Sequence, residues 1–251
     1  MANVFLTGAS GFVGRNLAAK LIGRGHSVRG LVRPGSEGRL PKGCRPVIGD
    51  PLDPATYASR VAPADVFVQL VGVTHPSPAK AAEFRAIDLV AGMAAVEAAV
   101  SAGVRHFVYV SVAQPAPIMK EYIAVRHEVE EKLRRSGLNA TVLRPWYVLG
   151  PGRRWPLLLL PMYWLMGAIP STRDSARRLG LVTLAQMIDA MARAVEDPPE
   201  GVRVWEVPEI RRFGRVTDRS ADPHRSTPRA PGASPGAPAA RRPQTRTPSP
   251  D

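Results

Sequence analysis

The chain has 251 residues, 45% of them hydrophobic, which is enough to bury the core of one ordinary domain. The net charge of +13 raises nucleic acid as a partner, but roughly half of the excess lies beyond residue 210, outside the apolar part of the chain. We therefore expect no nucleic-acid binding. The single cysteine, Cys44, excludes an intrachain disulfide and favours a reducing compartment. The N-terminus lacks a signal-peptide pattern and no apolar run is long enough to span a membrane, so we expect a cytoplasmic protein.

From residue 2 to about 209, short runs rich in β-branched residues alternate with helical patterns. Strands are expected over 3–7, 26–33, 45–48, 65–72, 105–112, 139–145 and 202–209, and helices over 12–24, 54–61, 80–103, 119–136 and 184–197. This alternation is typical of crossover units that build a parallel sheet covered on both faces. The sequence therefore predicts an α/β fold with a doubly wound parallel sheet.

The stretch TGASGFVG, residues 7–14, follows the first expected strand and opens the first expected helix. Gly8 permits a tight turn, Gly11 lets the backbone approach a pyrophosphate, and Gly14 allows close packing of helix on strand. The helix N-terminus adds unpaired N–H groups that attract an anion. We therefore predict a dinucleotide site formed by Gly8, Ala9, Ser10, Gly11, Phe12, Val13 and Gly14.

The GxxGxxG spacing resembles the nucleotide loop of extended and atypical short-chain dehydrogenase/reductase proteins. Further stretches match that family in order: GDPLDP (49–54), LVGV (70–73), the long segment 84–111 and LRPWYVLGPG (143–152). The resemblance implies a Rossmann fold with an NAD(P)-binding domain over 1–150. It also implies cofactor contacts from Asp50 and Pro51 near the adenine, from Leu70, Val71 and Gly72 after the fourth strand, and from Pro145, Trp146, Tyr147 and Val148 near the nicotinamide.

The second expected strand ends at Arg33, where an NAD site usually has a carboxylate. A guanidinium there suits a 2′-phosphate, so we expect NADP as the cofactor. Glu37, a few residues later, keeps NAD as the alternative.

The resemblance also implies a catalytic Ser and a Tyr-x-x-x-Lys pair. The matching residues are Ser111, which polarises the substrate carbonyl, Tyr122, the acid or base, and Arg126, which stands where lysine belongs. Because that lysine binds the nicotinamide ribose in the family, the resemblance implies that Tyr122 and Arg126 also contact the cofactor. Tyr122 and Arg126 are four residues apart and share a helix face. Arginine keeps the positive charge but cannot pass a proton onward as lysine can.

With arginine at the lysine position, three functions stay open. The first is an NADP-dependent oxidoreductase acting on an apolar carbonyl compound. The second is a non-catalytic NAD(P)-binding sensor or assembly subunit, similar to NmrA-like regulators or a complex I accessory subunit. The third is a nucleotide-sugar epimerase or dehydratase, which needs a more polar C-terminal part. The histidines show no metal-ligand spacing, so no metal is expected.

Residues 151–209 are expected to form a small C-terminal subdomain that completes the fold. Its apolar run over 155–169 is either a buried helix or a lid that contacts a lipophilic substrate or a membrane surface. The Arg- and Pro-rich tail, 210–251, is expected to be disordered, and a frameshift product is the alternative that an intact-mass measurement tests. Both a monomer and a homodimer fit the sequence.

Overall fold

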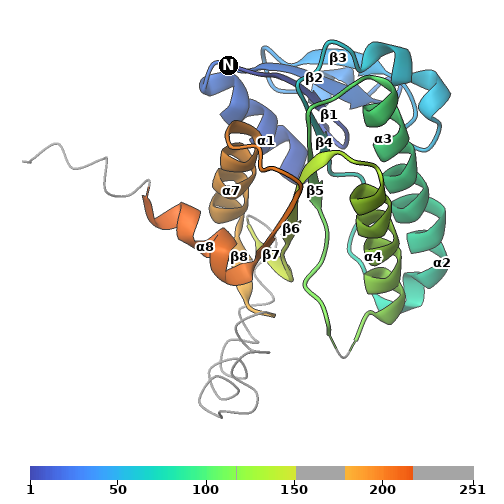
Figure 1. Ribbon diagram of the computed structural model, residues 1–251, viewed down its shortest axis with the longest axis vertical. Coiled ribbons are helices and arrows are strands. Elements are labelled where there is room, and N and C mark those ends of the chain that lie inside the picture. The colour runs from blue at the N-terminus through green and yellow to red at the C-terminus, as the bar shows by residue number, and fades with distance from the viewer. Residues whose placement is uncertain (117, 151–178, 217–251) are drawn as a thin grey trace, which may run out of the picture. The chain divides into compact units, whose positions relative to one another are not determined.

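The computed structural model describes residues 1–116, 118–150 and 179–216 (Figure 1). The strands are β1 Asn3–Leu6, β2 Ser27–Val32, β3 Arg45–Ile48, β4 Val66–Gln69, β5 His106–Val110, β6 Asn139–Arg144, β7 Tyr147–Leu149, β8 Leu181–Thr183 and β9 Val202–Glu206. The helices are α1 Phe12–Gly23, α2 Ala81–Glu83, α3 Val90–Ser101, α4 Lys120–Arg135, α7 Leu184–Glu196 and α8 Val207–Val216.

Within the described residues, seven strands form one parallel sheet in the order β3-β2-β1-β4-β5-β6-β9. The order reverses between β1 and β4, and a doubly wound sheet binds its ligands outside the carboxyl ends of the strands at such a switch point. The predicted doubly wound parallel sheet is confirmed. The TGASGFVG loop leaves β1 at this switch point.

Helices cover both faces of the sheet, with α1 and α7 on one face and α3 and α4 on the other (Figure 1). Helix α1 buries Gly14, Leu17, Ala18 and Leu21, a spacing that places them on one side of the helix. Helix α7 begins with a capping box in which Thr183 and Gln186 satisfy each other's backbone N–H groups. The strands between the helices are apolar on both faces, and all four residues of β4 are buried.

Two segments differ from the sequence prediction. In place of a helix over 54–61 the chain forms two short 3₁₀ helices, Pro54–Thr56 and Ala58–Arg60. The helix expected over 80–103 is interrupted by a π-helical segment, Phe84–Leu89, between α2 and α3.

The sequence predicts that the disordered tail starts at residue 210, but helix α8 continues to Val216. Ile210 is fully buried and Phe213 packs on Trp205 with ring centroids 4.7 Å apart, so these apolar residues order the first part of that segment. The final strand, expected to reach residue 209, ends at Glu206 because α8 begins at the next residue, Val207. The rest of the tail, 217–251, and the apolar run 155–169 lie outside the described residues.

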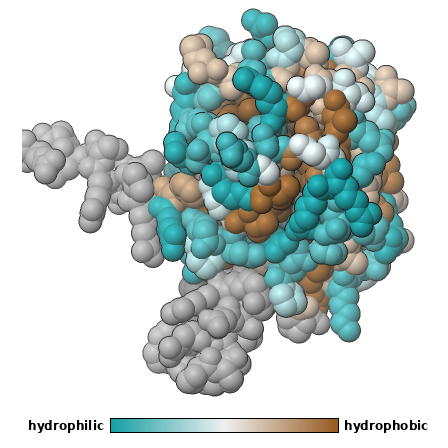
Figure 2. Space-filling model, in the orientation of Figure 1, coloured by the Kyte–Doolittle hydropathy of each residue, from teal (hydrophilic) through white to brown (hydrophobic). Residues whose placement is uncertain are grey.

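Strand β9 forms one edge of the sheet. Its Val202 and Val204 pack with Leu138 against the core beneath α3 and α4, and they stay partly exposed. Figure 2 shows hydrophobic side chains gathered at the centre of an otherwise hydrophilic face. Among the described residues, no helix combines the length and the hydropathy that crossing a membrane requires.

Candidate nucleotide and substrate site

The glycine-rich loop forms a tight cradle ahead of α1. Gly8 has a φ of +68°, and its carbonyl oxygen accepts the N–H of Gly11 at 3.0 Å. A Cβ at Gly14 would overlap that same oxygen, so the helix approaches the loop more closely than any other residue would permit. No side chain caps the N-terminus of α1, and its first turn has no acidic residue. The N–H groups at this helix end can therefore bind an anion, which the helix dipole also attracts.

The loop residues differ in how they can contact a ligand. Ser10, Gly11, Phe12 and Val13 are accessible to solvent, whereas the Ala9 side chain is fully buried in the core. Ala9 can therefore contact a ligand only through its backbone.

The loops after β2 and β3 carry the residues expected near the adenine half of the cofactor. Arg33 directly follows β2 and is exposed. Glu37 accepts the Gly35 N–H at 3.2 Å, so its carboxylate is engaged within its own turn. Asp50 is exposed and accepts the N–H of Leu52 at 2.9 Å, which fixes the turn that also contains Pro51.

The turn after β4 lies directly against the glycine loop. A Cβ on Gly8 would lie 3.0 Å from the backbone carbon of Leu70, and the N–H of Thr7 donates to Val68 O at 3.0 Å. The same turn continues through Val71 and Gly72, which are partly exposed. Loop and turn therefore lie side by side at the carboxyl ends of β1 and β4.

Tyr122 and Arg126 lie together on α4. The Arg126 guanidinium is 5.0 Å from the centroid of the Tyr122 ring, and Phe84 also packs against that ring with centroids 4.8 Å apart. Arg126 donates to Val110 O at 2.9 Å and forms an ion pair with the buried Asp88. Burial alone would lower the pKa of Arg126, but Tyr122, Tyr109 and Asp88 raise it above its usual value, so the guanidinium stays charged.

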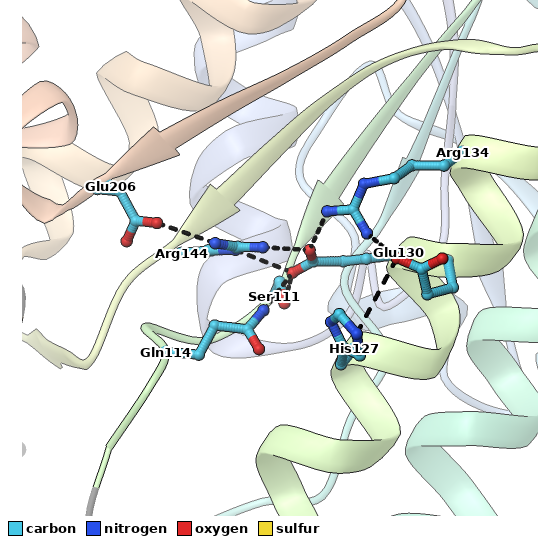
Figure 3. A network of polar contacts seen from close by, with 8 residues as sticks. Ser111, Gln114, His127, Glu130, Arg134, Arg144 and Glu206 are labelled. Atoms are coloured by element: carbon cyan, nitrogen blue, oxygen red, sulfur yellow. Dashed lines mark hydrogen bonds and ion pairs between the residues drawn. The ribbon is translucent and has the colours of Figure 1, made fainter.

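The structure brings Tyr122 and Arg126 together but directs Ser111 elsewhere. The Ser111 hydroxyl donates to the buried Glu130 at 2.6 Å (Figure 3). Glu130 also accepts from Gln114 at 3.1 Å, from Arg134 at 3.0 Å and from Arg144 at 2.5 Å. Ser111 is thus a member of a buried polar network in which Arg144 of β6 also binds Glu206 of β9 at 3.0 Å.

The segment expected near the nicotinamide leaves β6 at its carboxyl end. The carbonyl oxygen of Pro145 accepts the N–H of Ala113 at 3.0 Å, and the rings of Trp146 and Tyr147 meet edge to face with centroids 5.6 Å apart. Residues Tyr147 and Val148 then pair in parallel with Leu181 and Val182 of β8.

A hollow of about 370 Å³ lies beside Tyr122. Its walls are mostly apolar and include Pro78, Phe84, Ile118 and Met119, and the Ile118 side chain is half exposed. Tyr122 itself lines this hollow.

The comparisons with known proteins agree with this geometry. Residues 8–153 match the family described as NAD(P)H-binding. The chain belongs to this NAD(P)H-binding family. In a crystal structure the Bordetella bronchiseptica enzyme WbmH is bound to NAD⁺; this chain aligns with it at a TM-score of 0.62 and 22% identity, covering 91% of this chain and 84% of that one, which shows a shared fold.

Two curated relatives are reductases. The chain is 28% identical over 194 residues to the ceramide reductase of Caulobacter vibrioides, covering 76% of this chain and 59% of that protein. It is 29% identical over 226 residues to the 4-hydroxy-2-methyl-3-oxo-4-farnesyl-3,4-dihydroquinoline-1-oxide ketoreductase of Stigmatella aurantiaca, covering 78% of this chain and 65% of that protein. The chain thus spans less than two thirds of the length of both. The resemblance to short-chain dehydrogenase/reductase proteins is confirmed at the level of an NAD(P)H-binding family member.

The residues present fit a dinucleotide, because a cradle without room for side chains meets an uncapped helix N-terminus. Sequence reasoning missed Asp88 and Glu130. Each carried a signal: Asp88 is a lone carboxylate in a long apolar run, and Glu130 follows Tyr122 and Arg126 at intervals of four on one helix face. Among the described residues no cluster of His, Cys, Asp and Glu side chains is arranged to hold a metal ion.

Proposed function

We propose that this chain is an NAD(P)H-dependent reductase that acts on a carbonyl group carried by an apolar substrate. The observation that carries the proposal is the position of Tyr122, whose ring lies 5.0 Å from the Arg126 guanidinium and which also lines a mostly apolar hollow. The names of the two curated relatives, a ceramide reductase and a ketoreductase of a farnesyl compound, support both the reaction and the apolar substrate.

A bound dinucleotide would supply the hydride that the carbonyl carbon accepts. The glycine loop would hold its pyrophosphate, and the turn Leu70–Gly72 together with residues 145–148 would contact its nicotinamide end, as the resemblance implies. The Tyr122 phenol donates its proton to the substrate oxygen as negative charge develops there, and the nearby Arg126 charge stabilises the phenolate that remains.

The experiment is NAD(P)H oxidation with a panel of long-chain ketones. We expect Tyr122→Phe to lower kcat at least a hundredfold without changing cofactor affinity, since general acid catalysis contributes about 10²–10⁴ in rate. Tyr57→Phe is the matched control, because Tyr57 is fully buried beside Phe5 in the core. An unchanged rate in Tyr122→Phe would refute the role of Tyr122.

We further propose NADP as the preferred cofactor, held through Arg33. A bidentate contact between a guanidinium and a phosphate is lost in Arg33→Ala, which should weaken NADPH binding about ten- to a hundredfold and leave NADH binding nearly unchanged. Arg45→Ala is the control, since Arg45 is an exposed arginine at the opposite end of the neighbouring strand β3. Equal affinities of the wild type for the two nucleotides would argue against this assignment.

One observation favours a second candidate, a non-catalytic NAD(P)-binding protein. The Ser111 hydroxyl donates to Glu130 and is therefore not directed at a substrate oxygen. This alternative predicts cofactor binding without turnover on any carbonyl compound, so the same assay separates the two candidates.

A further inference from the structure

Asp88 is a buried carboxylate that the proposed proton transfer does not use. Its side chain is fully buried, and it lies in the π-helical segment between α2 and α3, an irregularity that is frequent at functional sites. One of its oxygens accepts the N–H of Val73 at 2.9 Å, and the other binds Arg126. Asp88 therefore joins the turn after β4 to helix α4.

Arg126 is held from three sides. Its side chain is only 7% exposed; one Nη donates to Val110 O at 2.9 Å, the other binds Asp88, and the guanidinium lies over the Tyr122 ring. Gly72 completes the arrangement, because a Cβ at this position would collide with Arg126 Nη2 and lie 2.9 Å from Asp88 Oδ1. A planar fork can make these contacts at once, whereas a lysine ammonium at the end of a flexible stem cannot.

We propose that Asp88 is the positioning residue of this site, and that Arg126 acts at the lysine position only as a unit with Asp88. The carboxylate balances a buried positive charge that would otherwise be costly, and it fixes the guanidinium against Tyr122. Replacing Arg126 by lysine alone then draws the ammonium towards Asp88 and away from Tyr122. The kinetic part of this inference rests on the proposed reductase function.

The test is a double-mutant cycle with Arg126→Lys, Asp88→Asn and the combined variant. Each single substitution is expected to lower kcat at least tenfold with a smaller change in KM, because the position of Tyr122 is disturbed more than the substrate pocket. Adding Asp88→Asn to Arg126→Lys is expected to raise kcat at least threefold, since the neutral amide no longer attracts the ammonium. Losses that simply multiply in the double variant overturn the proposal.

The same double-mutant cycle can be measured as the NADPH affinity of each variant by fluorescence titration, which needs no turnover. If the wild type binds cofactor but reduces nothing, the proposed function fails, while coupling between the two substitutions in the dissociation constant still supports the pair. Additive effects in that measurement overturn it. A wild type that binds neither nucleotide overturns the pair and the proposed function together.

A second variant tests the proposal even if the Asp88→Asn protein does not fold. Gly72→Ala keeps both charges but displaces the guanidinium, and it is expected to lower kcat at least tenfold. Asp65→Asn is the matched control, because it removes another Asp–Arg pair, with Arg105 at 2.5 Å, at the opposite end of the sheet. An equal loss of kcat in Gly72→Ala and Asp65→Asn would mean that Asp88 has a structural role only.

Discussion

At the scale of single residues, Gly14 shows how the nucleotide cradle depends on a missing side chain. A Cβ at this position would overlap the carbonyl oxygen of Gly8, which belongs to the rigid backbone of the loop. We expect Gly14→Ala to destabilise the protein by about 1–3 kcal/mol, the usual cost of overpacking, and to weaken cofactor binding at least tenfold. Urea unfolding and nucleotide titration measure the two effects.

Gly23 provides the control on the same helix. It is the last residue of α1, and a Cβ there meets no atom within 4 Å. Gly23→Ala is expected to raise stability by about 0.4–1 kcal/mol, because alanine loses less backbone entropy on folding. If both alanines lowered stability equally, helix α1 rather than its contact with the loop would be the sensitive feature.

At the scale of elements, one face of α4 joins the reaction site to the edge of the sheet. Tyr122, Arg126, Glu130 and Arg134 follow at intervals of four. Glu130 contacts Ser111, the residue directly after β5, and Arg144 of β6 (Figure 3). Burial alone would raise the pKa of Glu130, but hydrogen bonds from Arg144 and Ser111 and the charges of Arg144 and Arg134 hold that pKa below its usual range.

We expect Glu130→Gln to lower the free energy of unfolding by about 3–5 kcal/mol, since it removes the fully buried counter-charge of Arg144, whose side chain is only 15% exposed. Glu131→Gln, one position along and half exposed, is expected to cost under about 1 kcal/mol although Glu131 pairs with the same Arg134. Because the pKa of Glu130 is depressed in the folded state, its contribution is complete above the unfolded value near 4.3 and is lost as the pH falls below it. Equal unfolding midpoints for the two variants would contradict this account.

The elements that sequence reasoning found are those with strong local signals. The apolar strand β4 and the glycine loop before α1 follow from composition and spacing alone. The hydrogen-bond partner of Ser111 could not be predicted from the sequence, because Glu130 is nineteen residues away along the chain and only the packing of α4 on the sheet brings the two together. Likewise, the ion pair between Asp88 and Arg126 depends on a π-helical segment that no hydrophobic pattern in the sequence indicated.

At the scale of the whole molecule, stability should depend on the charge state of His106. This histidine on β5 is 1% exposed, and its Nε2 is 3.0 Å from Thr141 Oγ1. Burial, reinforced by the charge of Arg203, lowers the pKa of His106 to about 4. The folded protein therefore keeps His106 neutral at pH values where the unfolded chain, with a pKa near 6.5, takes up a proton.

Above pH 6.5 this group does not affect the free energy of unfolding, and between pH 6.5 and 4 it should lower that energy by up to about 3 kcal/mol. His106→Gln keeps a hydrogen-bonding group near Thr141 but cannot titrate, so its stability should fall less over that range. The difference between the two pH curves, measured by urea unfolding, isolates His106 from other titrating groups. Parallel curves would show that His106 gains its proton in the folded state as easily as in the unfolded state.

Strands β7 and β8 have a consequence for how this protein can be altered. Tyr147 pairs with Leu181 and Leu149 with Thr183, so residues more than thirty positions apart in the sequence are held side by side. When the two ends of a segment are already held together, doubling its length costs only about 0.6 kcal/mol in closure entropy. The pairing of β7 with β8 therefore keeps the closure entropy a small part of the cost of changing the number of residues between 150 and 179.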